Sequence, residues 1–273
     1  MTTKDLSKYT HANMDKEAGV NHVSHKTKIV ATVGPACDTY EKLLELVQTG
    51  VNVFRLNFSH GSNEHKATVI EHIRNINSTQ PYNVAILADL QGPKLRIGEI
   101  ESNELHVEIG DVFLFTNEKC IGTKDKIYIS YPNLADDVKI GNLILIDDGK
   151  IEVKVVVIVG GVLSSNKGIN LPDTKISLPA LTEKDLEDLE FIIEQKLDWV
   201  ALSFVRSVKD IVILRSKLDE KKSKTKIIAK IEKPEALVSI RDIVLESDGI
   251  MIARGDLGVE LPVEQVPLIQ RQL

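Results

Sequence analysis

Short apolar runs alternate with amphipathic segments along most of the sequence. Apolar residues recurring every three or four positions predict helices at 41–48 and 64–77 and after Thr182, Ser207 and Pro234. The apolar runs predict strands at 28–33, 51–56, 84–89, 198–202, 226–230 and 249–253. Strands that alternate with helices are typical of a parallel sheet, and continuous apolar runs are typical of strands covered on both faces. The pattern therefore predicts an α/β fold of the TIM-type (β/α) barrel class.

The alternation is interrupted after the third predicted strand. Here the pattern predicts short strands at 105–109, 126–129, 143–146 and 151–159. Asp147-Asp148-Gly149 separates the last two and is typical of a hairpin turn. We therefore expect a small all-β domain of the size of a lid, inserted into the barrel.

The number of predicted strands indicates an incomplete barrel. Six are predicted, whereas a closed barrel of this type has eight. A further helix is predicted to begin near Pro262 to Pro267, and it has no stop signal before Leu273. Either the fold is an open sheet or the sequence is truncated, and the missing stop signal favours truncation. Its predicted parts are an N-terminal tail (1–26), a first part of the barrel (27–93), the inserted β-domain (94–179) and a second part of the barrel (180–273).

Composition excludes some classes of function. The net charge of −6 argues against a partner with a phosphate backbone or an acidic membrane surface. The two cysteines, Cys37 and Cys120, lie far apart without the spacing of a metal site, as in a reduced intracellular protein. Neither a signal peptide nor a run of the roughly 20 apolar residues of a membrane span is present. We expect a cytoplasmic protein that binds neither nucleic acid nor membrane.

The candidate chemistry lies where two predicted strands end. Lys230-Ile231-Glu232 closes one strand, and Arg254-Gly255-Asp256 closes the next. Polar residues at strand C-termini lie on the catalytic face of a parallel barrel, where two carboxylates could share a hard divalent cation. Lys230 points the same way as Glu232, because side chains in a strand alternate with a period of two. A lysine beside a metal site suits a reaction that moves negative charge.

Cations gather at the other strand ends as well. Arg55 lies at the end of the second predicted strand, and Lys94, Arg96 and Arg206 follow the third and fourth. Cations around a metal fit phosphoryl transfer, in which catalysis is largely positioning and electrostatics. Without a P-loop motif, phosphate would be held by side chains.

Simpler interpretations stay open for these residues. Lys230 and Glu232 could form only an ion pair at the end of a strand. Asp256 could be the N-cap of the following helix. His60 fits a packing role better than that of a catalytic base.

The sequence resembles the pyruvate kinase family over roughly 27–273. The motifs that carry the resemblance occur in family order: Thr32-Val33-Gly34-Pro35-Ala36, residues 55–61, Asp89 with Gly92-Pro93, Lys167-Gly168-Ile169-Asn170-Leu171-Pro172, Lys230-Ile231-Glu232 and residues 253–258. The resemblance implies transfer of a phosphoryl group from phosphoenolpyruvate to ADP, giving pyruvate and ATP. It also implies that the full-length protein is a homo-oligomer, namely a tetramer.

The resemblance assigns roles to individual residues. Glu232 and Asp256 would bind Mg²⁺, while Lys230 and Arg55 would stabilise and bind the phosphoryl group. The other implied positions are Gly255 with Asp256 for the substrate, Asn57, His60, Arg96 and Lys167 for the nucleotide, and Asn57, Ser59, Asp89 and the Leu90 carbonyl for a monovalent cation.

One departure from most of the family concerns that cation. Most members that the sequence resembles have a glutamate at the position of Lys94 and a threonine at that of Leu90, and they need K⁺. The ammonium of Lys94 can supply the positive charge that K⁺ would otherwise bring. The resemblance therefore implies that K⁺ is not required.

Two rival functions remain. One is a Mg²⁺-dependent aldolase or lyase acting on 2-oxo acids, which also places a glutamate and an aspartate on successive strands. The other is an inactive, truncated fragment that keeps the site residues without turnover.

Overall fold

A computed structural model describes residues 26–154, 156–157, 161–171, 174 and 177–273. All but the last residue of the predicted N-terminal tail, and Pro172 of the Lys167–Pro172 motif, lie outside the described residues. The chain divides into two compact units, residues 1–87 and 88–273, and each is described by itself. In the part of the chain that is described, no helix is long and apolar enough to cross a membrane.

The first unit contains two strand–helix pairs. These are β1 (Ile29–Thr32), α1 (Tyr40–Gln48), β2 (Val51–Asn57) and α2 (Asn63–Thr79). The side chains of Thr39 and Ser62 cap the two helices by accepting backbone N–H groups three residues later, so each helix starts one residue before its predicted start. β1 and β2 pair in parallel, as predicted.

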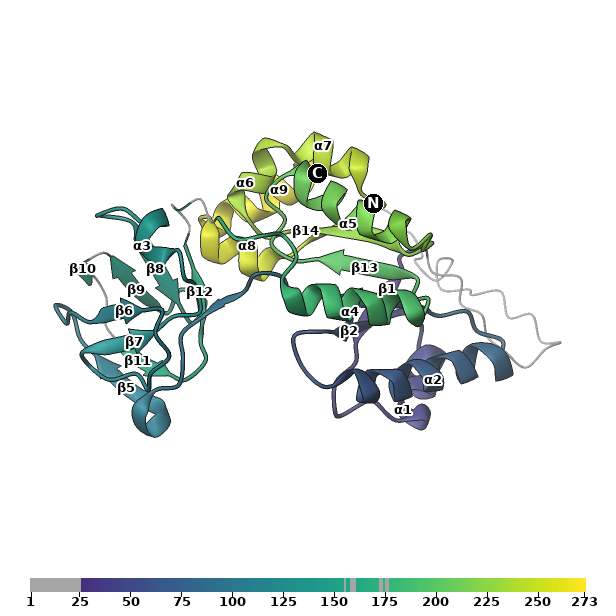
Figure 1. Ribbon diagram of the computed structural model, residues 1–273. Helices are drawn as coiled ribbons and strands as arrows, with labels where there is room; N and C mark the ends of the chain where they lie inside the picture. The colour runs from purple at the N-terminus through teal and green to yellow at the C-terminus, as the bar shows by residue number, and fades with distance from the viewer. Residues whose placement is uncertain (1–25, 155, 158–160, 172–173, 175–176) are drawn as a thin grey trace, which may run out of the picture. The chain divides into compact units, whose positions relative to one another are not determined.

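The second unit continues the alternation. It contains α4 (Glu183–Glu194), β13 (Trp199–Leu202), α5 (Val208–Glu220), β14 (Lys226–Ile231), α6 (Pro234–Val238), α7 (Ile240–Glu246), β15 (Gly249–Ile252), α8 (Arg254–Glu260), a 3-10 turn η3 (Val263–Gln265) and α9 (Val266–Gln272), which Figure 1 shows from green to yellow. β13, β14 and β15 pair in parallel. The sequence boundary between the two units falls within β3 (Ala85–Asp89), and the strand order is β1-β2-β3-β13-β14-β15.

Two predictions for this region were wrong in detail. The single helix expected after Pro234 is two helices, α6 and α7, because Ser239 has non-helical dihedrals of φ −117° and ψ 25°. β15 was expected to be covered on both faces, but all of its residues are partly exposed, because it is the edge strand of the described sheet. β14, which has a strand on each side, is mostly buried.

The insert is rich in short strands. It contains β4 (Leu95–Arg96), the turn η2 (Glu101–Asn103), β5 (Glu104–Val107), β6 (Leu114–Thr116), β7 (Lys126–Tyr128), α3 (Leu134–Asp137), β8 (Leu143–Ile146), β9 (Ile151–Lys154), β10 (Val156–Val157), β11 (Gly161–Ser164) and β12 (Gly168–Asn170). Its largest sheet has the order β10-β9-β8-β12-β4 and is antiparallel. The single turn α3 was not predicted. In the strand predicted at 151–159, the described residues form two shorter strands, β9 and β10, whereas residues 155 and 158–159 lie outside the described residues.

The predicted hairpin joins β8 to β9. Asp147, Asp148 and Gly149 all have positive φ (54°, 56° and 84°), which short polar residues and glycine tolerate best. The strand predicted at 105–109 ends at Val107, and Ile109 beyond it is exposed. The insert has a hydrophobic core of its own, which includes Ile127, Ile129, Tyr131 and Ile146.

Helix α5 allows a direct test of the buried face. We expect Leu214→Ala, at a fully buried position, to lower the free energy of unfolding by about 2–5 kcal/mol through lost apolar contacts and a cavity. Its neighbour Ile213 is 44% exposed, so Ile213→Ala should change this free energy by about 0.5 kcal/mol or less. Urea unfolding of both variants gives the comparison, and equal losses would contradict the packing described.

Candidate active site

The candidate site centres on a buried ion pair at the end of β14. The Lys230 ammonium lies 2.8 Å from Glu232 Oε1 and 3.3 Å from Asp89 Oδ1. It also donates a hydrogen bond of 2.8 Å to the hydroxyl of Ser203. Lys230 is 9% exposed and Glu232 2%. The two side chains meet because residues two apart in a strand point to the same face, as the sequence predicted.

Opposing effects set the charges of this pair. Burial lowers the pKa of Lys230, but the negative charges of Glu232 and Asp89 outweigh it and raise the pKa above its ordinary value. Lys230 therefore stays an ammonium at neutral pH. Burial raises the pKa of Glu232, the charge of Asp256 adds to this effect, and Lys230 opposes it. The Glu232 and Asp256 carboxylates thus repel each other in a partly dry site.

Backbone groups complete the cluster. The second oxygen of Glu232, Oε2, accepts the N–H of Phe204 at 2.8 Å. Phe204 has a positive φ of 56° in the turn after β13. The preceding hydroxyl, on Ser203, donates to the carbonyl of Leu90 at 2.8 Å, just after β3. The ends of three neighbouring strands are thereby joined around one lysine.

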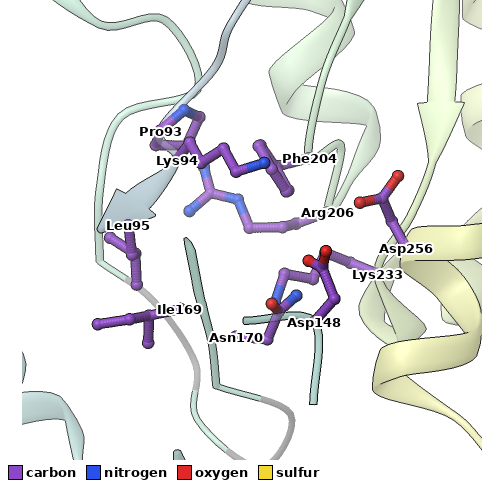
Figure 2. Close-up of a pocket in the computed structure, with 10 residues that line it drawn as sticks. All are labelled: Pro93, Lys94, Leu95, Asp148, Ile169, Asn170, Phe204, Arg206, Lys233 and Asp256. Atoms are coloured by element: carbon purple, nitrogen blue, oxygen red, sulfur yellow. The ribbon is translucent and has the colours of Figure 1, made fainter. Parts of the chain in front are cut away.

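A pocket opens beside this cluster (Figure 2). Its described lining carries the cations Lys94, Arg206 and Lys233 and the carboxylates Asp148 and Asp256, together with Pro93, Leu95, Ile169, Asn170 and Phe204. The view shows Lys94 and Arg206 extending into the pocket. Arg206 is oriented by its ion pair with Asp210 at 3.4 Å and by a 2.9 Å hydrogen bond to the Leu178 carbonyl. The mixture of charges suits an anionic ligand that is accompanied by a cation.

The insert reaches this pocket through β12. Asn170 donates a hydrogen bond of 2.9 Å to Glu260 Oε1 at the end of α8. The same oxygen lies 2.5 Å from the ammonium of Lys233, two residues after β14. Lys233 and Glu260 are both buried, so each offsets the desolvation of the other. This contact ties an insert strand to the parallel part of the unit.

Asp256 lies in the first turn of α8. The N-cap position is Ala253, so the interpretation of Asp256 as an N-cap was wrong. A Cβ added at its neighbour Gly255 would meet nothing within 4 Å, so the backbone is open to a ligand there. In the described residues, no group of three or more Asp, Glu, His or Cys side chains could hold a metal. Glu232 and Asp256 alone still fit Mg²⁺, which proteins commonly bind through one or two carboxylates and substrate oxygens.

The two predicted nucleotide-binding cations of this unit have partners on the insert. The ammonium of Lys167 lies 2.8 Å from Asp147. Hydrogen bonds from Lys167 and, to a smaller extent, from Lys150 lower the pKa of the Asp147 carboxyl. Arg96 donates a 3.0 Å hydrogen bond to the Asn166 carbonyl and does not belong to the pocket lining.

The remaining predicted residues belong to the first unit. Arg55 donates a hydrogen bond of 2.9 Å to the Thr32 hydroxyl. Asn57 accepts the N–H of Ser59 at 2.9 Å. The carbonyl of His60 accepts the ammonium of Lys66 at 2.8 Å. Their roles stay predictions.

Some residues of the site were missed by the sequence analysis. Lys233 directly follows the Lys230–Glu232 motif, and Asn170 is part of the Lys167–Pro172 motif, so position within a motif was the available signal. Asp148 was interpreted only as a turn residue, yet it lines the pocket.

The comparisons with known proteins agree with this geometry. Residues 24–273 match the family model described as "Pyruvate kinase, barrel domain". The chain belongs to the pyruvate kinase family. The predicted fold class is confirmed: six parallel strands of a partial barrel with an inserted antiparallel sheet.

Individual pyruvate kinases are similar over nearly the whole chain. One from Mycobacterium intracellulare is 43% identical over 260 residues, which cover 92% of this chain and 55% of the relative. One from Geobacillus stearothermophilus is 42% identical over 264 residues, covering 92% and 45%. The pyruvate kinase 2 of Synechocystis is 45% identical over 262 residues, covering 91% and 44%. The chain thus spans about half the length of these relatives.

The central ion pair has a testable effect on stability. Removing one partner of a buried ion pair costs roughly 3–5 kcal/mol. We expect Glu232→Gln to lower the free energy of unfolding at pH 7 by somewhat less, about 1–3 kcal/mol, because Asp89 still faces Lys230. Glu220→Gln is the control, since its ion pair with Lys217 is exposed and such pairs contribute about 0–1 kcal/mol. Chemical denaturation measures both, and a Glu232→Gln variant as stable as the control variant would contradict the assigned contact.

Proposed function

We propose that this protein transfers the phosphoryl group of phosphoenolpyruvate to ADP, giving pyruvate and ATP. The observation that carries the proposal is the set of Lys230, Glu232 and Asp256 at adjoining strand ends, in a chain of the pyruvate kinase family. The neighbouring pocket, with three cations and two carboxylates, supports binding of phosphorylated anions.

Glu232 and Asp256 would hold the Mg²⁺ that the family typically uses. When bound, the ion would neutralise negative charge on the carboxylate and enolate oxygens of the substrate. The repulsion between the two carboxylates supports this assignment, because a cation between them would relieve it. Each Glu232 oxygen keeps a lone pair for a metal after accepting from Lys230 or from the N–H of Phe204.

Lys230 would act on the phosphoryl group in transfer. A buried ammonium with a raised pKa is a fixed positive charge in a site of low dielectric, where it stabilises developing negative charge more than it would in water. Arg55 and Gly255 would contact the substrate.

The nucleotide would be held mainly by side chains. Asn57, His60, Arg96 and Lys167 are the proposed contacts. Lys167 would exchange its partner Asp147 for a phosphate, at little cost because the pair is partly exposed. Homo-oligomeric assembly and a cytoplasmic location stay predictions.

We further propose that K⁺ is not required. Of the four proposed monovalent-cation ligands, Asn57, Ser59, Asp89 and Leu90, two lie in the described second unit. The Asp89 carboxylate already faces the ammonium of Lys230, and the Leu90 carbonyl accepts the Ser203 hydroxyl. The buried side chain of Leu90 has no oxygen to add.

Lys94 supports the same proposal. Its side chain reaches the pocket, and a Cβ at Gly168 would lie 3.3 Å from its Cε, so glycine leaves room for the lysine. A positive charge here would repel K⁺ and replace its electrostatic effect.

The phosphoryl transfer is tested with Lys230→Met. Because Lys230 acts on charge that develops during transfer, we expect kcat to fall by about a hundredfold or more while the KM for phosphoenolpyruvate changes little. The control, Lys226→Met, removes an exposed lysine from the same strand and should keep kcat within about twofold. Pyruvate formation with Mg²⁺ and ADP is measured, and a variant with unchanged kcat and a raised KM would refute the role of Lys230.

The K⁺ proposal is tested in potassium- and sodium-free buffer with a tetramethylammonium salt. We expect full turnover, with less than about twofold activation by added K⁺, since Lys94 supplies the charge. Lys94→Glu should turn over poorly without K⁺ and recover in part when it is added. Lys124→Glu, which makes the same charge change at an exposed position of the insert, should not respond. Strong K⁺ activation of the unmodified protein would overturn the proposal.

A further inference from the structure

The carboxylate of Asp185 connects two distant parts of the chain. The residue is 0% exposed and lies in the first turn of α4. Its Oδ2 accepts the N–H of Thr182 at 2.9 Å and the hydroxyl of Thr182 at 2.6 Å. Its Oδ1 accepts the N–H of Gly92 at 3.0 Å, 93 positions earlier in the sequence. The bonds to Thr182 cap the helix, whereas the bond to Gly92 contributes nothing to the helix.

These two partners flank the insert predicted at 94–179. Gly92 lies between β3 and β4, where the chain leaves the parallel strands, and Thr182 directly precedes α4, where it returns. One buried carboxylate therefore holds both connections of the insert. Because the insert carries Lys94, Asn170 and Asp148 to the pocket, the geometry of these connections decides where the three side chains lie.

Gly92 is fixed on every side. Its carbonyl accepts the N–H of Lys94 at 2.8 Å, so the turn at Pro93 is closed as well. Its φ is +66°, and a Cβ would lie 3.1 Å from atoms of both Ser203 and Phe204. The peptide held by Asp185 thus packs directly against the turn whose N–H and hydroxyl bind Glu232 and Lys230.

We propose that Asp185 is a positioning residue for the active site. Through Gly92 it sets the direction of Lys94 and supports the turn at Ser203 and Phe204, although its own carboxylate does not belong to the pocket lining. The predicted effect on turnover rests on the proposed function, whereas the effect on the backbone does not.

The first test uses the unmodified chain and amide hydrogen exchange followed by NMR. The Gly92 amide lies in a connection between strands, and Asp185 is its acceptor. We expect exchange slowed on the order of a hundredfold relative to an exposed loop amide. Gly141, in an exposed turn of the insert, is the internal reference. Exchange of Gly92 as fast as that of Gly141 would overturn the proposal.

The second test separates positioning from helix capping. Asp185→Ala removes both carboxylate oxygens, so Gly92 and Thr182 both lose this acceptor. The matched variant Thr182→Val removes the capping hydroxyl but keeps the bond to Gly92. Both should lower the melting temperature, but only Asp185→Ala should lose the protection of Gly92 and lower kcat/KM for phosphoenolpyruvate, by about tenfold or more.

The outcomes distinguish the two proposals. Equal effects of Asp185→Ala and Thr182→Val on Gly92 exchange would reduce Asp185 to a helix cap and refute the positioning role. If Asp185→Ala does not fold, the exchange of Gly92 in the unmodified chain decides. A protected Gly92 in a chain without turnover would support the backbone role and count against the proposed phosphoryl transfer alone.

Discussion

The burial of one ammonium group, that of Lys230, is the constraint on which the site depends. A charge removed from water must be compensated by nearby acceptors or lose its proton. Glu232, Asp89 and Ser203 provide this compensation from β14, the end of β3 and the turn after β13. The strand ends must therefore keep their register, because a shift of one residue would turn Lys230 or its acceptors to the opposite face.

The negative charges of the carboxylates are not fully compensated by the single positive charge of Lys230. Glu232 is paired with Lys230, and burial and the negative charge of Asp256 raise its pKa. The pair of Glu232 and Asp256 therefore favours binding of a divalent cation, and a third carboxylate ligand is not needed. Lys94, Arg206 and Lys233 line the adjoining pocket together with Asp148 and Asp256. The electrostatics fit a reaction in which a phosphoryl group moves between two anions, for which positioned charges are the main catalytic means.

The sequence predicted the parts of the site that depend on strand geometry. Lys230 and Glu232 share a face because side chains in a strand alternate with a period of two. Their ammonium and carboxylate groups can be read directly from the residue types. The N–H of Phe204 and the carbonyl of Leu90 could not be predicted in this way, since every residue has such groups and only the tertiary fold selects them.

The sequence pattern also did not predict contacts between distant residues, the break in one helix or the exposure of one strand. Asn170 and Glu260 meet across 90 positions, and Asp185 and Gly92 across 93. The break at Ser239 lies within a continuous helical period of apolar residues, so the periodicity did not reveal it. The exposure of β15 follows from its place at the edge of the described sheet, which its apolar sequence does not reveal.

Direct measurement of divalent-cation binding tests the central claim without any requirement for turnover. Free Mn²⁺, measured by electron paramagnetic resonance during titration of the chain, should reveal a site that Asp256→Asn weakens about tenfold or more, since half of the carboxylate pair is lost. The control is Asp242→Asn, which removes an exposed aspartate from the first turn of α7 and should leave binding unchanged. Equal Mn²⁺ binding by the unmodified chain and by Asp256→Asn would contradict the account.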